Sequence, residues 1–327
     1  MLLGLFKSNN SLIVLIILII CIALFMPIAP ISIGPSNSYS MLFFTHVNSF
    51  FLEFPIVNKT FAFILLIVQS IIITVLFNYS SFVKKETYLP AFIYILLYLF
   101  FNKQLILNSA LLANFLILIS LFLNFKSYVI KKPYSKILNS TILISIASLF
   151  YFPVLFLVIV IWLSFFNYSM YKWREWVISI MGLLIPYIFI FMYYFMIDDL
   201  YLFNNIKLNY FKLSLNYRNI LDLSYIQLIT LGFLIILILT SFIHFLKKID
   251  EGLIKVRKYK IMIFWITLIF ITINALFFYN LKDFTNMIIP ISILLSYYFL
   301  TSLKKIFIGI IFYLMIVLII LSNYILI

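Results

Sequence analysis

Residues 60–78, TFAFILLIVQSIIITVLFN, carry no charged side chain. Their near-continuous apolar character lacks the alternating polarity of a barrel strand. About 20 apolar residues at a rise of 1.5 Å each are needed to cross the roughly 30 Å hydrocarbon core of a bilayer. The stretch therefore predicts a transmembrane α-helix.

The rest of the chain repeats this pattern. The 327 residues are 66% hydrophobic and 10% charged, with a mean hydropathy of +1.22, whereas a soluble domain has about a quarter of its residues charged. We expect an all-α fold, a polytopic transmembrane helical bundle of about eleven spans (nine to eleven), in one integral membrane domain over residues 1–327 with no soluble domain. The predicted spans lie near 12–29, 60–78, 88–101, 109–125, 137–152, 154–168, 177–196, 225–245, 261–279, 287–301 and 306–325. The third, fifth, sixth and tenth are short, as in tilted helices or re-entrant hairpins such as 88–125 and 137–168.

Lysine and arginine fall mainly on every second connection, which predicts the orientation of the helices. Cytoplasmic loops retain the positive excess, so the richer set is assigned to the cytoplasm. That set holds 17 residues: Lys7, Lys84, Lys85, Lys126, Lys131, Lys132, Lys136, Lys172, Arg174, Lys247, Lys248, Lys255, Arg257, Lys258, Lys260, Lys304 and Lys305. The other set holds six: Lys59, Lys103, Lys207, Lys212, Arg218 and Lys282. The N-terminus is expected inside and the C-terminus outside.

The same count decides between two interpretations of residues 137–168. If they form one long helix kinked at Pro153, every later loop changes sides and the split becomes 11 against 12. Since that arrangement has no charge bias, we favour a hairpin of two helices.

Several classes of function lack their sequence signals. The six glycines have no phosphate-binding spacing, which excludes an ATP-driven pump. Cys21 is the only cysteine and His46 and His244 are the only histidines, so we expect no metal site and no cofactor. The net charge of +14 lies in short loops, which indicates contact with membrane lipids and not with nucleic acid.

Polar residues inside the spans are uncharged. All nine acidic residues lie in loops or at span ends, which argues against ion-coupled transport. We expect the polar side chains to form interhelical hydrogen bonds, with the fourth span an interior helix. They are Gln69, Asn78, Asn108, Asn114, Asn124, Asn139, Thr272 and Asn274.

Two predicted outer loops are long enough to carry a site, and the first is residues 30–58. Glu53 is its only acidic residue, seven positions after His46. We consider Glu53 as a general base and His46 as a substrate-binding residue at the membrane surface. The alternative is a solvated carboxylate or an ion pair with Lys59.

The second long loop, residues 198–224, combines an alternating segment with charge. Residues 211–218 alternate apolar and polar side chains with the period of a strand. Arg218 is a candidate for binding a phosphate or pyrophosphate in a bidentate manner. The alternative is an ordinary ion pair with Asp198, Asp199 or Asp222.

Trp173, Arg174, Glu175 and Trp176 open the seventh predicted span at the cytoplasmic side. Two tryptophans three positions apart share a helix face and suit the headgroup region, and Glu175 complements the positive end of the helix dipole. We expect this interfacial motif to anchor the helix, with a functional role as the alternative.

Three segments, SLFYFP at 148–153, WREW at 173–176 and GLLIPY at 182–187, together resemble a family of polytopic inner-membrane proteins of Bacteroidota that carries a domain of unknown function. The resemblance covers residues 100–190. The chain is also loosely similar to the C-type glycosyltransferase superfamily. That similarity implies a polyprenyl-phosphate-linked sugar as substrate and a catalytic carboxylate in the first outer loop, where Glu53 is the one matching position. The paired acidic residues usual in that superfamily are missing here.

The leading hypothesis is therefore a multi-pass inner-membrane protein of cell-envelope glycan assembly, acting on a polyprenyl-linked sugar at the outer face. One alternative is a non-catalytic subunit of a secretion or motility complex, in which residues 211–218 pair with a partner strand. Another is a lipid or solute translocator with a polar cavity reaching the bilayer midplane.

Overall fold

The computed structural model describes residues 44, 51, 53–102, 105–170, 172–198, 224–277, 281–302 and 305–324. Every regular element within these ranges is helical, so the expected all-α class is confirmed. The predicted span 12–29 and the alternating segment 211–218 lie outside the described residues.

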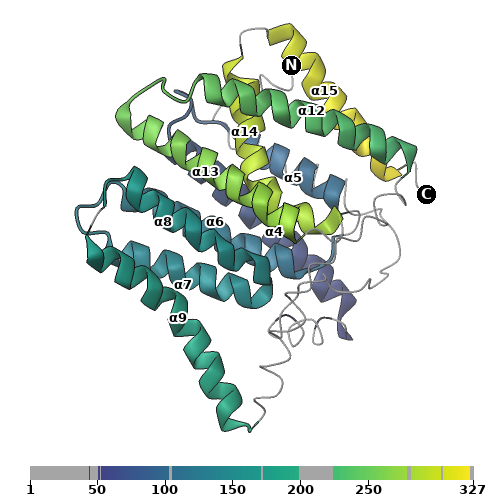
Figure 1. Cartoon of the computed structure of the whole chain (residues 1–327). Helices are drawn as coiled ribbons and strands as arrows, with labels where there is room; N and C mark the ends of the chain where they lie inside the picture. The colour runs from purple at the N-terminus through teal and green to yellow at the C-terminus, as the bar shows by residue number, and fades with distance from the viewer. Residues whose placement is uncertain are drawn as a thin grey trace.

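The other ten predicted spans are helices at nearly the predicted positions (Figure 1). Seven are long and apolar enough to cross a membrane, and three are shorter. The elements are α4 (Pro55–Tyr79), α5 (Leu89–Phe101), α6 (Ser109–Ser127), α7 (Tyr134–Phe150), η1 (Phe152–Leu157), α8 (Val158–Asn167), α9 (Trp173–Met196), α12 (Tyr225–Lys247), α13 (Ile254–Leu276), η2 (Leu281–Met287), α14 (Ile288–Thr301) and α15 (Lys305–Tyr324).

Local sequence signals account for several helix boundaries. Proline occupies the first turn of both α4 and α5, where its missing N–H removes no intrahelical hydrogen bond. Asn108 caps α6 by accepting from the Leu111 N–H at 2.6 Å. Ser224 and Gln227 form a capping box at the start of α12.

Interhelical hydrogen bonds show that the helices alternate in direction between two ends of the bundle. At one end, the start of α4 meets the start of α6, since the Leu107 N–H donates to Asn58 Oδ1 at 2.8 Å. At the same end, Asn323 Nδ2 near the end of α15 donates to the Leu99 carbonyl oxygen of α5 at 3.2 Å. We call this end the amide end, after its asparagines.

The opposite end carries most of the described cations, and we call it the basic end. It has 15 of the lysines and arginines in the described ranges: Lys84, Lys85, Lys126, Lys131, Lys132, Lys136, Lys172, Arg174, Lys247, Lys248, Lys255, Arg257, Lys258, Lys260 and Lys305. The amide end has two, Lys59 and Lys282. The charge asymmetry seen in the sequence thus coincides with the two ends of the folded bundle.

The chain reverses between α7 and α8, as the hairpin interpretation requires. Tyr151 adopts an extended conformation (φ −140°, ψ 104°) and ends α7 just before the Pro153 segment. Ser164, near the end of α8, accepts a hydrogen bond from Asn124 Nδ2 near the end of α6, at 3.2 Å. Both the start of α7 and the end of α8 therefore lie at the basic end, which one kinked helix would not allow.

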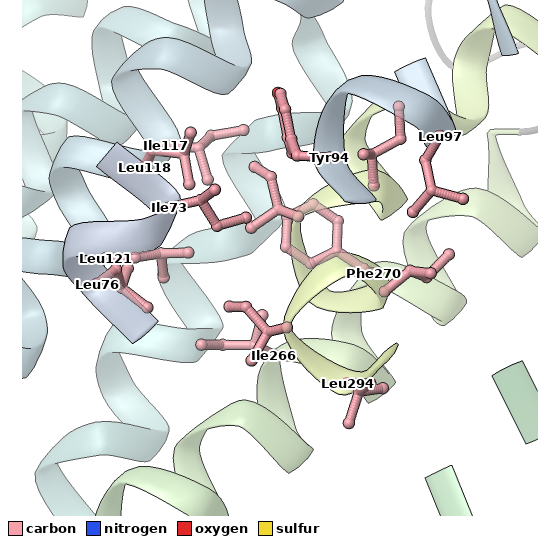
Figure 2. Packing of buried hydrophobic residues seen from close by; sticks show 14 of the residues in the cluster. Ile73, Leu76, Tyr94, Leu97, Ile117, Leu118, Leu121, Ile266, Phe270 and Leu294 are labelled. Atoms are coloured by element: carbon pink, nitrogen blue, oxygen red, sulfur yellow. The ribbon is translucent and has the colours of Figure 1, made fainter. Parts of the chain in front are cut away.

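The core is apolar and is shared by helices distant in sequence. Figure 2 shows Ile73 of α4, Leu118 of α6 and Phe270 of α13 packed together, with Tyr94 and Leu97 of α5 beside them. All these side chains are buried. In a membrane this packing contributes close van der Waals contact between helices, since lipid is as apolar as the side chains.

Helix α5 and helix α9 occupy opposite environments. In α5, all residues from Leu89 to Phe100 are buried, so its 13 residues, about 20 Å long, need not reach across the lipid. In α9, only 11% of the spanning window is buried. Figure 1 shows the C-terminal half of α9 running away from the other helices. The exposed Phe189, Met192 and Phe195 are suited to contact with lipid chains.

Small and hydroxyl side chains join α9 to α7. A Cβ at Gly182 would lie 2.0 Å from Thr141 Oγ1, so only glycine allows this approach. Ser145 Oγ donates to the Leu183 carbonyl oxygen at 2.8 Å, and the hydroxyls of Ser148 and Tyr187 lie 2.7 Å apart. Two of the three segments that suggested the family resemblance thus contact each other here.

The basic connection after α12 is more structured than the sequence predicts. Helix α13 begins at Ile254, seven residues before the predicted span, so Lys255, Arg257, Lys258 and Lys260 belong to its first two turns. Lys260 is buried, and its ammonium group donates to the carbonyl oxygens of Lys248 and Glu251. It therefore holds the end of α12 against the start of α13.

Candidate functional site

The predicted catalytic residue Glu53 lies at the amide end, directly before α4. Its side chain is exposed and forms no hydrogen bond or ion pair with another described residue. The pair with Lys59 is thus not seen among the described side chains. His46 and Arg218 lie outside the described residues, so the structure does not place them beside Glu53.

The interfacial motif at the start of α9 divides between two environments. Trp173 is 70% exposed, whereas the Trp176 ring packs against the rings of Trp162, Phe165 and Phe166 at centroid distances of 6.2, 5.3 and 5.5 Å. Arg174 is exposed, and Glu175 is buried with its Oε2 atom unpaired among the described residues. The motif thus anchors α9 to α8 through Trp176, while Trp173 faces outward.

A cluster of buried amides lies at the amide end, where α5 stops and α6 begins. The described residues of the connection between them, 102 and 105–108, are non-helical, and Asn102, Leu105 and Leu107 are buried. Backbone at membrane depth needs hydrogen-bond partners when it is not helical. Asn58 accepts from the Leu107 N–H, and Asn108 caps α6 and donates to Asn102 Oδ1 at 3.2 Å.

The same cluster extends to η2 and α15. Asn114 Nδ2 donates to the Thr285 carbonyl oxygen of η2 at 3.0 Å. Asn323 Nδ2 donates to the Leu99 carbonyl oxygen at the end of α5. Asparagine side chains thus bind both the α5–α6 connection and the 3-10 helix η2. We call the residues Asn58, Asn102, Asn108, Ser109, Asn114, Asn286 and Asn323 the amide cluster.

The amide cluster retains hydrogen-bonding capacity that the described residues do not use. A buried polar group without a hydrogen-bond partner lowers the stability of a protein by roughly 1–3 kcal/mol. Such groups are therefore uncommon in protein interiors. Five buried side-chain atoms of the cluster have no partner among the described residues: Asn102 Nδ2, Ser109 Oγ, Asn114 Oδ1, Asn286 Oδ1 and Asn323 Oδ1.

Gln69, in contrast, has its hydrogen bonds satisfied in the layer next to the cluster. Its Nε2 atom donates to the Leu111 carbonyl oxygen at 2.7 Å, and its Oε1 atom accepts from the Tyr94 hydroxyl at 2.6 Å. Gln69 and Tyr94 are fully buried. This pair joins α4, α5 and α6 and has a structural role.

The chemistry of the amide cluster is neutral. Of the described side chains that are buried, only Glu175 and Lys260 are of the types that carry a charge at neutral pH, and both lie at the basic end. In the described ranges, no three His, Cys, Asp or Glu side chains gather as metal ligands. Amides and a hydroxyl offer both donors and acceptors without charge, which suits a hydroxyl-rich neutral group better than an ion.

The sequence pointed to only part of this cluster. Asn108 and Asn114 were predicted to form interhelical hydrogen bonds, whereas Asn58, Asn102, Asn286 and Asn323 were not singled out. A signal was present, because asparagines flank the short gap between two apolar runs at 102 and 108. Their convergence with η2 and α15 depends on contacts between segments about 170 to 220 residues apart.

No protein-family model, no curated protein and no solved structure matches this chain. Its class is therefore defined by composition and fold alone: a multi-pass helical membrane protein.

Proposed function

We propose that this chain is an inner-membrane protein of cell-envelope glycan assembly that binds the sugar of a polyprenyl-phosphate-linked substrate at its amide end. The observation that carries the proposal is the amide cluster, in which five buried, uncharged hydrogen-bonding atoms have no partner among the described residues. Sugar hydroxyls both donate and accept hydrogen bonds, so they complement amides and Ser109.

The orientation of the bundle supports a site on the outer face. Cytoplasmic ends of membrane helices carry the excess of lysine and arginine. The basic end has 15 described cations against two at the amide end. We accordingly assign the basic end to the cytoplasm and the amide end to the outer face, with the N-terminus inside and the C-terminus outside.

Glu53 and Arg218 complete the proposed chemistry. Glu53 is a solvent-accessible carboxylate at the amide end and would act as general base on the acceptor hydroxyl. Arg218, which follows α9 in the sequence, would bind the phosphate or pyrophosphate of the carrier. We thus propose for this chain both a glycosyltransferase activity and membership of the Bacteroidota family.

The test is complementation of a strain that lacks the chain. Four variants are compared with wild type: Glu53→Gln, Arg218→Ala, Asn114→Leu and the control Asn139→Leu. Asn139 is an exposed asparagine of α7 near the basic end, so its variant has the same chemical change at a different place. Envelope glycans and polyprenyl-linked sugars are extracted and quantified by mass spectrometry, with membrane protein level measured by immunoblot.

We expect the first three variants to lower the envelope glycan at least tenfold and to accumulate the polyprenyl-linked sugar at normal protein level. Asn139→Leu should match wild type. A wild-type glycan profile for Glu53→Gln, Arg218→Ala and Asn114→Leu would end the proposal.

A further inference from the structure

A second group of side chains, at the basic end, combines aromatic rings with two lysines. We call it the aromatic–lysine cluster; it comprises Tyr79, Phe122, Lys126, Tyr128, Tyr168, Lys255 and Tyr259. These residues come from the ends of α4, α6 and α8, the α6–α7 connection and the start of α13. Segments that are up to 180 residues apart in the sequence meet here.

The rings form one continuous contact set. Tyr79 lies 5.6 Å from Phe122 and 6.1 Å from Tyr259, measured between ring centroids. Tyr128 lies 5.8 Å from Tyr259 and 5.0 Å from Tyr168. Tyr259 is fixed in place because its hydroxyl donates to the Phe125 carbonyl oxygen at 3.0 Å and its ring stacks on Phe125 at 4.8 Å.

Two ammonium groups are held against neighbouring rings of this set. Lys126 Nζ lies 4.3 Å from the Phe122 centroid, and Lys255 Nζ lies 4.8 Å from the Tyr79 centroid and 5.6 Å from that of Tyr259. Cation–π contact orients each ammonium group. Neither lysine forms an ion pair with a carboxylate of the described residues. Two positive charges therefore lie against the neighbouring rings of Phe122 and Tyr79 with no paired carboxylate among these residues.

A further polar group in the cluster lacks a partner. The Tyr168 hydroxyl is buried and has no hydrogen-bond partner among the described residues, and the Tyr168 side chain is 7% exposed. The Tyr168 ring joins the cluster through Tyr128. Two oriented cations and a hydroxyl donor unused among the described residues, in one cluster, are complementary to an anion with several acceptor oxygens. Basic pockets between membrane helices bind lipid headgroups by this chemistry.

We propose that the aromatic–lysine cluster is a binding site for a phosphate group, carried by an anionic lipid headgroup or by a free phosphate. Lys126 and Lys255 provide the charge. The Phe122 ring holds the Lys126 ammonium group in place, and the Tyr79 and Tyr259 rings hold that of Lys255. This site is separate from the amide cluster and does not depend on the function proposed for it.

The test measures binding to the purified full-length chain in detergent. The ligands are dioctanoyl phosphatidylglycerol, dioctanoyl phosphatidylcholine and inorganic phosphate. The variant Lys126→Gln/Lys255→Gln removes the two cations, and the control Lys131→Gln/Lys132→Gln removes two exposed lysines of the same end. Both variants change the net charge equally, so a general surface effect would affect them alike.

We expect wild type to bind phosphatidylglycerol at least tenfold more tightly than phosphatidylcholine. The Lys126→Gln/Lys255→Gln variant should lose about 25-fold in affinity, since each lysine near a headgroup contributes roughly a fivefold factor. The control should lose less than threefold. Competition by inorganic phosphate would identify phosphate itself as the ligand, and its failure to compete would identify the lipid.

Equal losses of affinity in the two double variants, or no loss in either, would contradict the proposed site. If the double variant does not remain monodisperse, Lys126→Gln is compared with Lys131→Gln, with about a fivefold difference expected. The same affinity for these two single variants would also overturn it.

Discussion

At the scale of single residues, Gly182 sets how closely α9 approaches α7. A methyl group there would collide with Thr141 Oγ1 at 2.0 Å and lie 3.1 Å from the Leu138 carbonyl oxygen. We predict that Gly182→Ala destabilises the protein by about 1–3 kcal/mol, as overpacking does. The measurement is thermal or denaturant unfolding in detergent, followed by tryptophan fluorescence.

Gly232→Ala in α12 is the matched control, because a Cβ at Gly232 meets nothing within 4 Å. Alanine has the higher helix propensity, so this variant should be as stable as wild type or slightly more stable. Equal effects of the two substitutions would contradict the close approach at Gly182.

A second residue-scale prediction concerns Lys260, whose ammonium group binds the carbonyl oxygens of Lys248 and Glu251. Lys260→Met leaves these oxygens without that donor and should cost about 1–3 kcal/mol. Hydrogen exchange in the turn between α12 and α13 should become faster. Lys247→Met, which removes the charge of an exposed lysine at the same turn, should leave the hydrogen exchange unchanged.

At the scale of elements, the Gln69–Tyr94 hydrogen bond links α4 to α5, and Gln69 also reaches α6. Gln69→Leu leaves the buried Tyr94 hydroxyl without its acceptor, at a cost of about 1–2 kcal/mol. Because replacing both partners by apolar groups restores a matched interior, the double variant Gln69→Leu/Tyr94→Phe should be more stable than Gln69→Leu alone. A strictly additive double-mutant cycle would show that the two side chains are not coupled.

The elements themselves could mostly be predicted from the sequence, because an apolar run of helical length has few alternatives in a membrane. The α7–α8 hairpin was also predictable, since fusing the two helices destroys the charge bias. The start of α13 was not, because its first two turns are charged and become helical through the contacts of Lys260 and Tyr259. Likewise, the amide cluster depends on which helices become neighbours, and a single sequence does not specify that.

At the scale of the whole molecule, the two ends of the bundle differ in charge. We predict that, in a Cys21→Ser background, a membrane-impermeant thiol reagent labels Glu53→Cys in intact cells. It should label Lys131→Cys only after the cells are permeabilised. A reporter fused after Ile327 and active only in the cytoplasm should be silent. The reverse labelling pattern would invert the assignment of the two ends.

The complete enclosure of α5 has a consequence for biogenesis. Helix α5 packs against α14 and α15, which are synthesised long after it. Until α14 and α15 are made, α5, which is about 20 Å long, is not fully surrounded by other helices. The helices made before α14 and α15 therefore form an open half-bundle, and the bundle closes around α5 only after these two helices have been made.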